Sequence, residues 1–160
     1  SLCVGDTKIQ FELGSSKIVS KVIDGKFPDY TKVVPKSNKK ILNLKVKDFI
    51  QSIERVITVS IDRKEGVKVT LEKGNIQLFV NSSSSGEGKE TLAANYKDEN
   101  LTISFNSRYL LDIASAIEDE KIIINLNDSV SPVLIQDDSD KHSYYVIMPM
   151  KIWNFLGFTK

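Results

Sequence analysis

The residues able to perform acid–base or metal chemistry gather near the end of the chain. His142, the single histidine, lies in the acidic segment DDSDKHS. A histidine acts as a general base beside a positioned nucleophile and an orienting group, and the sequence singles out neither. Asp137, Asp138 and Asp140 offer oxygen ligands, but the segment lacks the glycine and terminal glutamate of a calcium-binding loop. We therefore expect a hairpin turn kept soluble by its charges, with no catalytic role and no bound metal.

A second candidate for chemistry is the segment GEGKET at residues 86–91, which has the composition of a phosphate-binding loop. Its glycines and lysine do not have the spacing GxxxxGK[ST]. The residues that follow also favour a strand, whereas a phosphate-binding loop continues into a helix. The sequence therefore predicts a protein that is not an enzyme and that needs no cofactor.

The composition limits the possible partners and compartment. The 160 residues suffice for one full domain and part of another, and the net charge of +1 predicts neither nucleic-acid nor membrane affinity by itself. Cys3 is the single cysteine, which excludes an internal disulfide and fits a reducing cytosol. No apolar run is long enough to span a membrane, and the chain does not begin with methionine. We expect a cytoplasmic piece of a longer protein.

Residues 22–35, VIDGKFPDYTKVVP, form a connector around which the other segments are organised. Pro28 and Pro35 push the residue before each of them out of the helical region. Apolar and charged side chains alternate, a composition that a solvated linker would avoid. We expect an extended strap that lies against a surface and joins two packed units.

The segments on either side of the strap have clear periodicity. Alternating residues predict a hairpin of strands at residues 7–13 and 16–22. After the strap, the pattern predicts a strand at 41–44, a helix from 45 to about 59, strands at 67–71 and 76–80, a polar loop at 82–89 and a strand at 90–96. A second series follows: a strand at 101–105, a helix capped by Asn106 or Ser107, and strands at 121–126, 132–136 and 143–150. The apolar face of this second helix is expected to include Tyr109, Leu110, Ile113, Ala114 and Ile117.

Both series have the order strand, helix and three strands, which indicates an internal duplication. Neither helix is followed by the long crossover that parallel strands require. The sequence therefore predicts an α+β domain with two helices side by side on one face and antiparallel sheets behind them.

Three segments resemble one family. DGKFPDYTKVVP resembles the interdomain segment of the bacterial sliding clamp, the beta subunit of DNA polymerase III, and YYVIMPMK resembles its closing strand. NDSVSPVLI, between them, extends the resemblance over nearly the whole chain. The resemblance implies a DNA-clamp fold. It also implies that residues 1–36 are the end of the central clamp domain with the strap, that 37–152 are the C-terminal clamp domain, and that 153–160 are a short extension.

The resemblance implies a non-catalytic processivity factor that encircles duplex DNA as a head-to-tail homodimer. It would tether the replicative polymerase and the clamp loader through short peptides that contain glutamine and paired hydrophobic residues. The helix residues that would face DNA, through loose and sequence-independent contacts, are Lys45, Lys47, Arg55 and Arg108. The residues that would meet another protomer are Thr58, Val59, Glu87 and Glu90. Without the resemblance, a solvated helix face explains the same charges equally well.

The resemblance also implies a groove that binds the partner peptides. Its residues would be Pro28, Lys32 and Val33 of the strap, Asn106 and Tyr109 of the second helix, Val130, Ser131 and Pro132 of the turn, and Val146, Ile147, Met148, Pro149, Met150, Lys151 and Ile152 of the closing strand. Pro132 departs from the family, which usually has serine there. Periodicity alone favours another interpretation, in which Tyr109, Val146 and Met148 belong to the core.

Two further alternatives stay open at this stage. The chain could act as a free-standing peptide-binding adaptor that uses the same groove without forming a ring. The aromatic extension at residues 153–160 could occupy the peptide groove, or it could lie on the sheet as a short appended segment.

Overall fold

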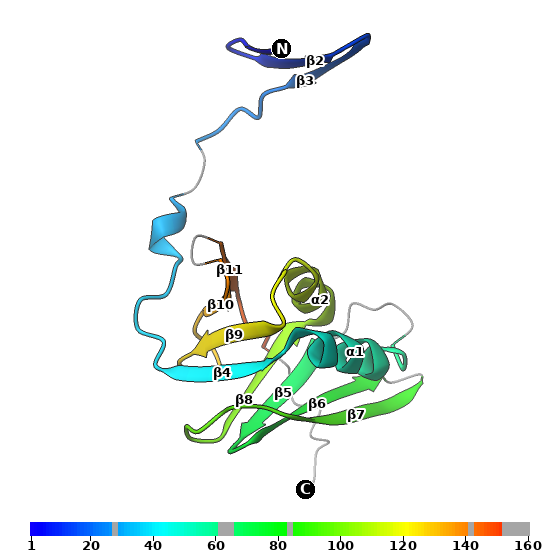
Figure 1. Ribbon diagram of the computed structural model, residues 1–160, viewed down its shortest axis with the longest axis vertical. Helices are drawn as coiled ribbons and strands as arrows, with labels where there is room; N and C mark the ends of the chain where they lie inside the picture. The colour runs from blue at the N-terminus through cyan, green and yellow to red at the C-terminus, as the bar shows by residue number, and fades with distance from the viewer. Residues whose placement is uncertain (27–28, 61–65, 83–84, 141–142, 152–160) are drawn as a thin grey trace, which may run out of the picture. The chain divides into compact units, whose positions relative to one another are not determined.

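The computed structural model describes residues 1–26, 29–60, 66–82, 85–140 and 143–151. The predictions made for Pro28, His142, Ile152 and the extension at 153–160 lie outside these residues. The chain divides into two compact units, Ser1–Tyr30 and Thr31–Lys160, which are described separately (Figure 1). Within the described residues, no helix has the length and apolar character needed to cross a membrane.

The first unit is a three-stranded antiparallel sheet in the order β1-β2-β3, formed by Leu2–Val4, Lys8–Leu13 and Ser16–Lys21. The predicted hairpin is β2 and β3, joined at Gly14 with φ of 59°. Strand β1 was not expected, because three residues are too few for a periodic pattern. Every side chain in these strands is at least partly exposed, so the sheet has no buried core of its own.

The strap differs from the prediction of an extended segment. A 3₁₀ helix, η1, occupies Tyr30–Lys32. A proline fixes its own φ and restricts the residue before it, and Tyr30–Lys32 contains no residue of either kind, so this stretch is free to turn. Within the described residues, Tyr30 and Val33 are 55% and 56% exposed.

The second unit has the predicted duplication. Its first half is β4 (Lys40–Lys45), α1 (Val46–Ile57), β5 (Gly66–Glu72), β6 (Asn75–Ser82) and β7 (Gly86–Ala93). Its second half is β8 (Leu101–Asn106), α2 (Ser107–Ser115), β9 (Lys121–Leu126), β10 (Val133–Asp137) and β11 (Tyr144–Ile147). The α+β class and the repeated order of strand, helix and three strands are confirmed.

The two halves exchange their first strands. The sheets have the orders β11-β10-β9-β4 and β7-β6-β5-β8, so β4 completes the sheet of the second half and β8 completes that of the first. Both exchanged strands pair antiparallel, with Leu42 opposite Ile124 and Val69 opposite Ile103. Helices α1 and α2 pack side by side (Figure 1). The alternating strands contribute to one continuous apolar core.

The helices begin in different ways. Lys45 precedes α1 without a side-chain cap, and the Val46 amide donates to the carbonyl of Glu120 instead. The Asn106 side chain caps α2 by accepting from the amides of Arg108 and Tyr109, at 3.0 and 3.3 Å. This helix ends at Ser115, earlier than its apolar pattern indicated.

Two predicted boundaries were wrong. The polar loop expected at 82–89 is shorter, because β7 begins at Gly86 and pairs with β6. Glycine is typical of turns, but Gly88 serves here for close packing: a Cβ atom on it would lie 2.5 Å from the Val56 carbonyl oxygen of α1. The closing strand, expected to reach residue 150, ends at Ile147, because Pro149 has no amide to donate.

Candidate functional site

A groove of about 680 Å³ lies where the closing segment, residues 148–151, meets strands β5 and β8 and the turn before β10. It brings together five residues of the predicted peptide site with five others. The lining residues are Val130, Met148, Pro149, Met150 and Lys151, and Lys68, Thr102, Ile103, Ser104 and Ser129.

The closing segment is tied to β8 by a main-chain hydrogen bond. The Met150 amide donates to the Ser104 carbonyl oxygen at 2.7 Å. Met148 and Met150 are 60% and 39% exposed, whereas Ile147 is buried in the core. The flexible thioether side chains therefore lie at the surface of the groove, where they can adapt to different apolar partners.

Asp128 shapes the turn that contributes Ser129 and Val130 to the groove. Its Oδ1 atom accepts from the amides of Val130 and Ser131, at 2.9 and 2.7 Å, and its Oδ2 atom accepts from the Ser131 hydroxyl at 2.8 Å. These hydrogen bonds lower the pKa of Asp128 to about 2, so the carboxylate stays ionised at neutral pH. The turn holds Val130 with 63% of its surface exposed. Sequence reasoning missed Asp128, although aspartate three residues before serine is typical of such a turn.

The remaining predicted groove residues lie outside this lining. Asn106 caps α2, and Tyr109 on the same helix is 59% exposed. Ser131, Pro132 and Val146 are half-buried, whereas Lys32 and Val33 are exposed. The interpretation of Tyr109 and Met148 as core residues was wrong, since both side chains are exposed. Periodicity shows which residues of a helix or strand share a face, but it does not show whether another element of the fold covers that face.

Asn38 holds the beginning of the second unit close to this turn. Its side-chain amide donates to the carbonyl oxygens of Asn125 and Pro132, at 2.7 and 3.0 Å. Nothing in the sequence marked Asn38, since both of its partners are more than eighty residues away in the chain.

The polar face of the two helices carries mixed charge. Lys45 and Lys47 share a shallow hollow with four acidic side chains, those of Asp48, Glu54, Asp119 and Glu120. Arg108 lies 3.9 Å from Asp112, one turn further along α2. The face therefore combines cations with neutralising carboxylates, as the sequence indicated.

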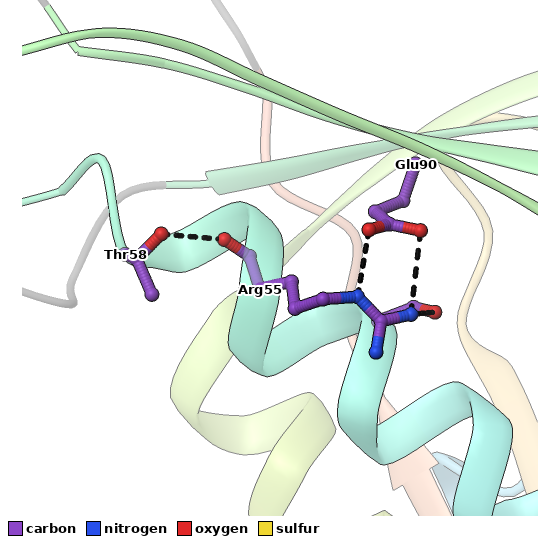
Figure 2. Close-up of polar contacts among 4 residues, drawn as sticks. Arg55, Thr58 and Glu90 are labelled. Atoms are coloured by element: carbon purple, nitrogen blue, oxygen red, sulfur yellow. Dashed lines mark hydrogen bonds and ion pairs between the residues drawn. The ribbon is translucent and has the colours of Figure 1, made fainter.

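Arg55 and Glu90, which were assigned to different surfaces, meet in one contact (Figure 2). Arg55 Nε donates to Glu90 Oε1 at 2.7 Å, and Nη2 donates to Glu90 Oε2 at 3.3 Å. Nη2 also donates to the hydroxyl of buried Ser52 at 2.8 Å. The ion pair raises the pKa of Arg55 and lowers that of Glu90. It joins α1 to β7.

The other predicted interface residues have separate positions. The Thr58 hydroxyl donates to the Arg55 carbonyl oxygen at 2.7 Å, which closes the end of α1 (Figure 2). Val59 packs partly against the core. Glu87 is exposed on β7, on the opposite face of the strand from Glu90.

The acidic segment has a structural role at Asp137, which is only 6% exposed. Its carboxylate accepts from the amide and hydroxyl of Ser139, at 2.9 and 2.6 Å, and from the amides of Glu118 and Asp119, at 3.0 and 3.4 Å. These bonds lower its pKa to about 2. The part of the chain that the structure describes contains no group of three or more histidine, cysteine, aspartate or glutamate residues able to hold a metal ion.

Comparisons with known proteins agree with this architecture. Residues 31–151 match the family described as DNA polymerase III beta subunit, C-terminal domain. The chain is 38% identical over 151 residues to the beta sliding clamp of Caulobacter vibrioides, covering 94% of this chain and 41% of that protein. It is 32% identical over 149 residues to the beta sliding clamp of Escherichia coli, covering 93% of this chain and 41% of that protein.

Solved structures give the same result. The sliding clamp of Bartonella birtlesii, solved bound to griselimycin, is 43% identical with a TM-score of 0.87, covering 94% of this chain and 41% of that chain. The present chain thus spans about two fifths of the length of the relatives it matches. The chain belongs to the family of the bacterial DNA polymerase III beta subunit, the beta sliding clamp, and residues 31–151 correspond to the C-terminal domain of that subunit.

Proposed function

We propose that this chain is the C-terminal part of a sliding clamp, a non-catalytic processivity factor for DNA replication in the bacterial cytoplasm. The observation that carries the proposal is the groove beside Met148 and Met150, which lies in a domain that matches the clamp family over residues 31–151. In this proposal, residues 1–36 end the central clamp domain and residues 37–152 form the C-terminal domain.

The groove is suited to a peptide with paired hydrophobic side chains. Val130 and Met148 are largely exposed apolar groups in its lining, and burying one such side chain contributes roughly 1.5–3 kcal/mol. Pro149 keeps the backbone between the methionines rigid, so little entropy is lost on binding. Replicative polymerase and clamp loader would each present a short peptide of this kind.

DNA would be held by topology. A dimeric ring keeps the polymerase close to the primer end by raising its effective concentration. Tight neutralisation of many phosphates would add salt-dependent affinity and would oppose sliding. The mixed charge around Lys45, Lys47 and Arg108 suits such a loose contact. The dimer contact would involve the end of α1 at Thr58 and Val59 and the edge strand β7.

Peptide binding by the full-length protein tests this function. A labelled peptide containing glutamine and a Leu-Phe pair is titrated with wild type, Met148→Ala and Tyr109→Ala. Ile41→Ala is the matched control, because Ile41 is a large apolar residue, 48% exposed, outside the groove lining. We expect weaker binding for Met148→Ala and Tyr109→Ala and unchanged binding for the control. Unchanged affinity in both Met148→Ala and Tyr109→Ala would remove the assignment.

A further inference from the structure

A row of two lysines, a serine and a phenylalanine crosses the outer face of the sheet beside the groove. Lys68 on β5 lies opposite Ser104 on β8 and opposite Phe79 on β6, and Phe79 in turn lies opposite Lys89 on β7. Directly opposed residues of antiparallel strands have their side chains on the same face. The Lys68 ammonium lies 4.7 Å from the centre of the Phe79 ring, a cation–π contact.

The groove opens onto this row at Lys68. Two of its ten lining residues are lysines, Lys68 and Lys151, and none of the ten is acidic. Among the residues that the structure describes, neither lysine has a carboxylate at ion-pair distance. The groove lining therefore combines apolar side chains, among them Met148 and Val130, with two lysines and no carboxylate.

We propose that the groove extends across β8 to Lys68 and accepts an acidic residue that flanks the hydrophobic motif of the same partner peptide. This inference rests on the proposed function. A carboxylate of the peptide would meet two lysines in this lining, Lys68 and Lys151, and no acidic side chain. The Thr102 and Ser129 side chains, which also line the groove, offer hydrogen bonds to the peptide main chain.

A peptide fits these observations better than a nucleic acid. A phosphate backbone is bound by many cations in a row, whereas this groove has two. The same lining also contains apolar residues, so an occupant should present hydrophobic and acidic groups a few residues apart. Acidic residues flanking a hydrophobic motif have this chemistry.

The test uses three peptides that share the hydrophobic motif and carry glutamate, serine or lysine on both flanks. Binding to the full-length protein is measured at low and at high salt, for wild type, Lys68→Glu and Lys89→Glu. Lys89 is the matched control, because it lies on the same face, two strands away from Lys68, and does not line the groove. Circular dichroism verifies that each variant is folded.

We expect wild type to bind the glutamate-flanked peptide roughly threefold to fivefold more tightly than the serine-flanked one, as for an exposed ion pair. This preference should disappear in about 1 M salt. Lys68→Glu should reverse the order in favour of the lysine-flanked peptide, and Lys89→Glu should preserve it. Equal wild-type affinity for the three peptides, or the same change in both variants, would overturn the inference while leaving the groove intact. Failure of all three to bind would overturn the proposed function and this inference with it.

Discussion

The two halves of the second unit share one order of elements but use their side chains differently. In the first half, β4 to β7, α1 approaches β7 so closely that Gly88 touches the Val56 main chain, and Arg55 pairs with Glu90. In the second half, β8 to β11, the corresponding helix leaves Tyr109 exposed, and the segment after β11 leaves Met148 exposed.

This difference indicates a division of labour within a duplicated fold. The contacts of Gly88 and Arg55 in the first half are made inside the chain, where they stabilise the domain. In the proposed function, the exposed Tyr109 and Met148 side chains of the second half would be buried by a bound peptide. Substitutions in the first half should therefore affect the free energy of unfolding most, and those around the groove should affect peptide affinity most.

The largest effect on stability is expected for Gly88→Ala. The added Cβ atom would lie 2.5 Å from the Val56 carbonyl oxygen and 3.1 Å from the Val56 Cα atom, so α1 must move away from β7. Overpacking of this kind costs about 1–3 kcal/mol. Urea unfolding of wild type and variant measures the change in the free energy of unfolding.

Gly25→Ala is the matched control for this substitution. A Cβ atom on Gly25 meets nothing within 4 Å, so the same change of residue type should be nearly neutral there. Equal stability of both variants would contradict the close contact between α1 and β7.

The next largest effect is expected on peptide affinity, for Asp128→Ala. The Asp128 carboxylate accepts hydrogen bonds from the amides of Val130 and Ser131 and so keeps this turn ordered. Without the carboxylate, peptide binding would have to order the turn, which costs conformational entropy. We expect affinity to fall roughly threefold to tenfold, the value of one or two lost hydrogen bonds. Asp128→Asn, which retains an acceptor, should recover part of the loss.

Asp137→Ala is the control that distinguishes the positioning of the groove turn by Asp128 from a general loss of stability. Asp137 accepts comparable hydrogen bonds, but it ties β10 to the connection before β9 and does not line the groove. It should lower the thermal midpoint without changing peptide affinity. If Asp128→Ala and Asp137→Ala both weakened peptide binding in proportion to their loss of stability, the proposed role of Asp128 in ordering the groove turn would be contradicted.

The repeated elements could be predicted because their signals are local. The apolar spacing of α1 and the alternation of β5, β6 and β9 depend on residues a few positions apart, and Asn106 has the residue type of a helix cap. The start of β7 could not be predicted in this way. Gly86 and Gly88 indicate a turn locally, and only pairing with β6 and contact with α1 make them part of a strand.

The family resemblance named five of the residues that line the groove, and its assignment as a peptide site stays a prediction. Periodicity alone placed Met148 in the core, whereas the Met148 side chain is 60% exposed. Lys68 was missed because its place in the groove depends on the path of the closing segment. The hydrogen bond from Met150 to Ser104, two residues that are 46 positions apart, fixes that path. Arg55 and Glu90 meet 35 positions apart for the same reason: tertiary packing brings them together.

The stability contributed by Asp137, in the second half, should depend on pH. The pKa of Asp137 is lowered from 3.8 to about 2, so its stabilising contribution is complete above pH 3.8 and is lost as the pH falls toward 2. Asp137→Asn should be less stable than wild type at pH 7, and the difference should vanish near pH 2. Thermal midpoints between pH 2 and 7 measure this, with Asp138→Asn as an exposed control that loses the same charge. A constant difference across the range would contradict the ionised state of Asp137.

The smallest effect is expected for Glu90→Gln, which asks whether packing or charge joins α1 to β7. The Arg55 side chain is 53% exposed and that of Glu90 is 28% exposed, and ion pairs open to water contribute little because solvent and salt screen them. Glutamine retains an oxygen acceptor for the Arg55 Nε–H group, so the contact of Figure 2 can persist without the charge. We expect a fall in the thermal midpoint smaller than that of Gly88→Ala, decreasing further as salt is added. Asp112→Asn, which removes the longer pair with Arg108, provides a control for loss of an exposed acidic partner on a helix. If close packing joins α1 to β7, removing the charge of Glu90 should change the thermal midpoint little. A fall for Glu90→Gln as large as that for Gly88→Ala, and insensitive to salt, would mean instead that the ion pair holds the first half together.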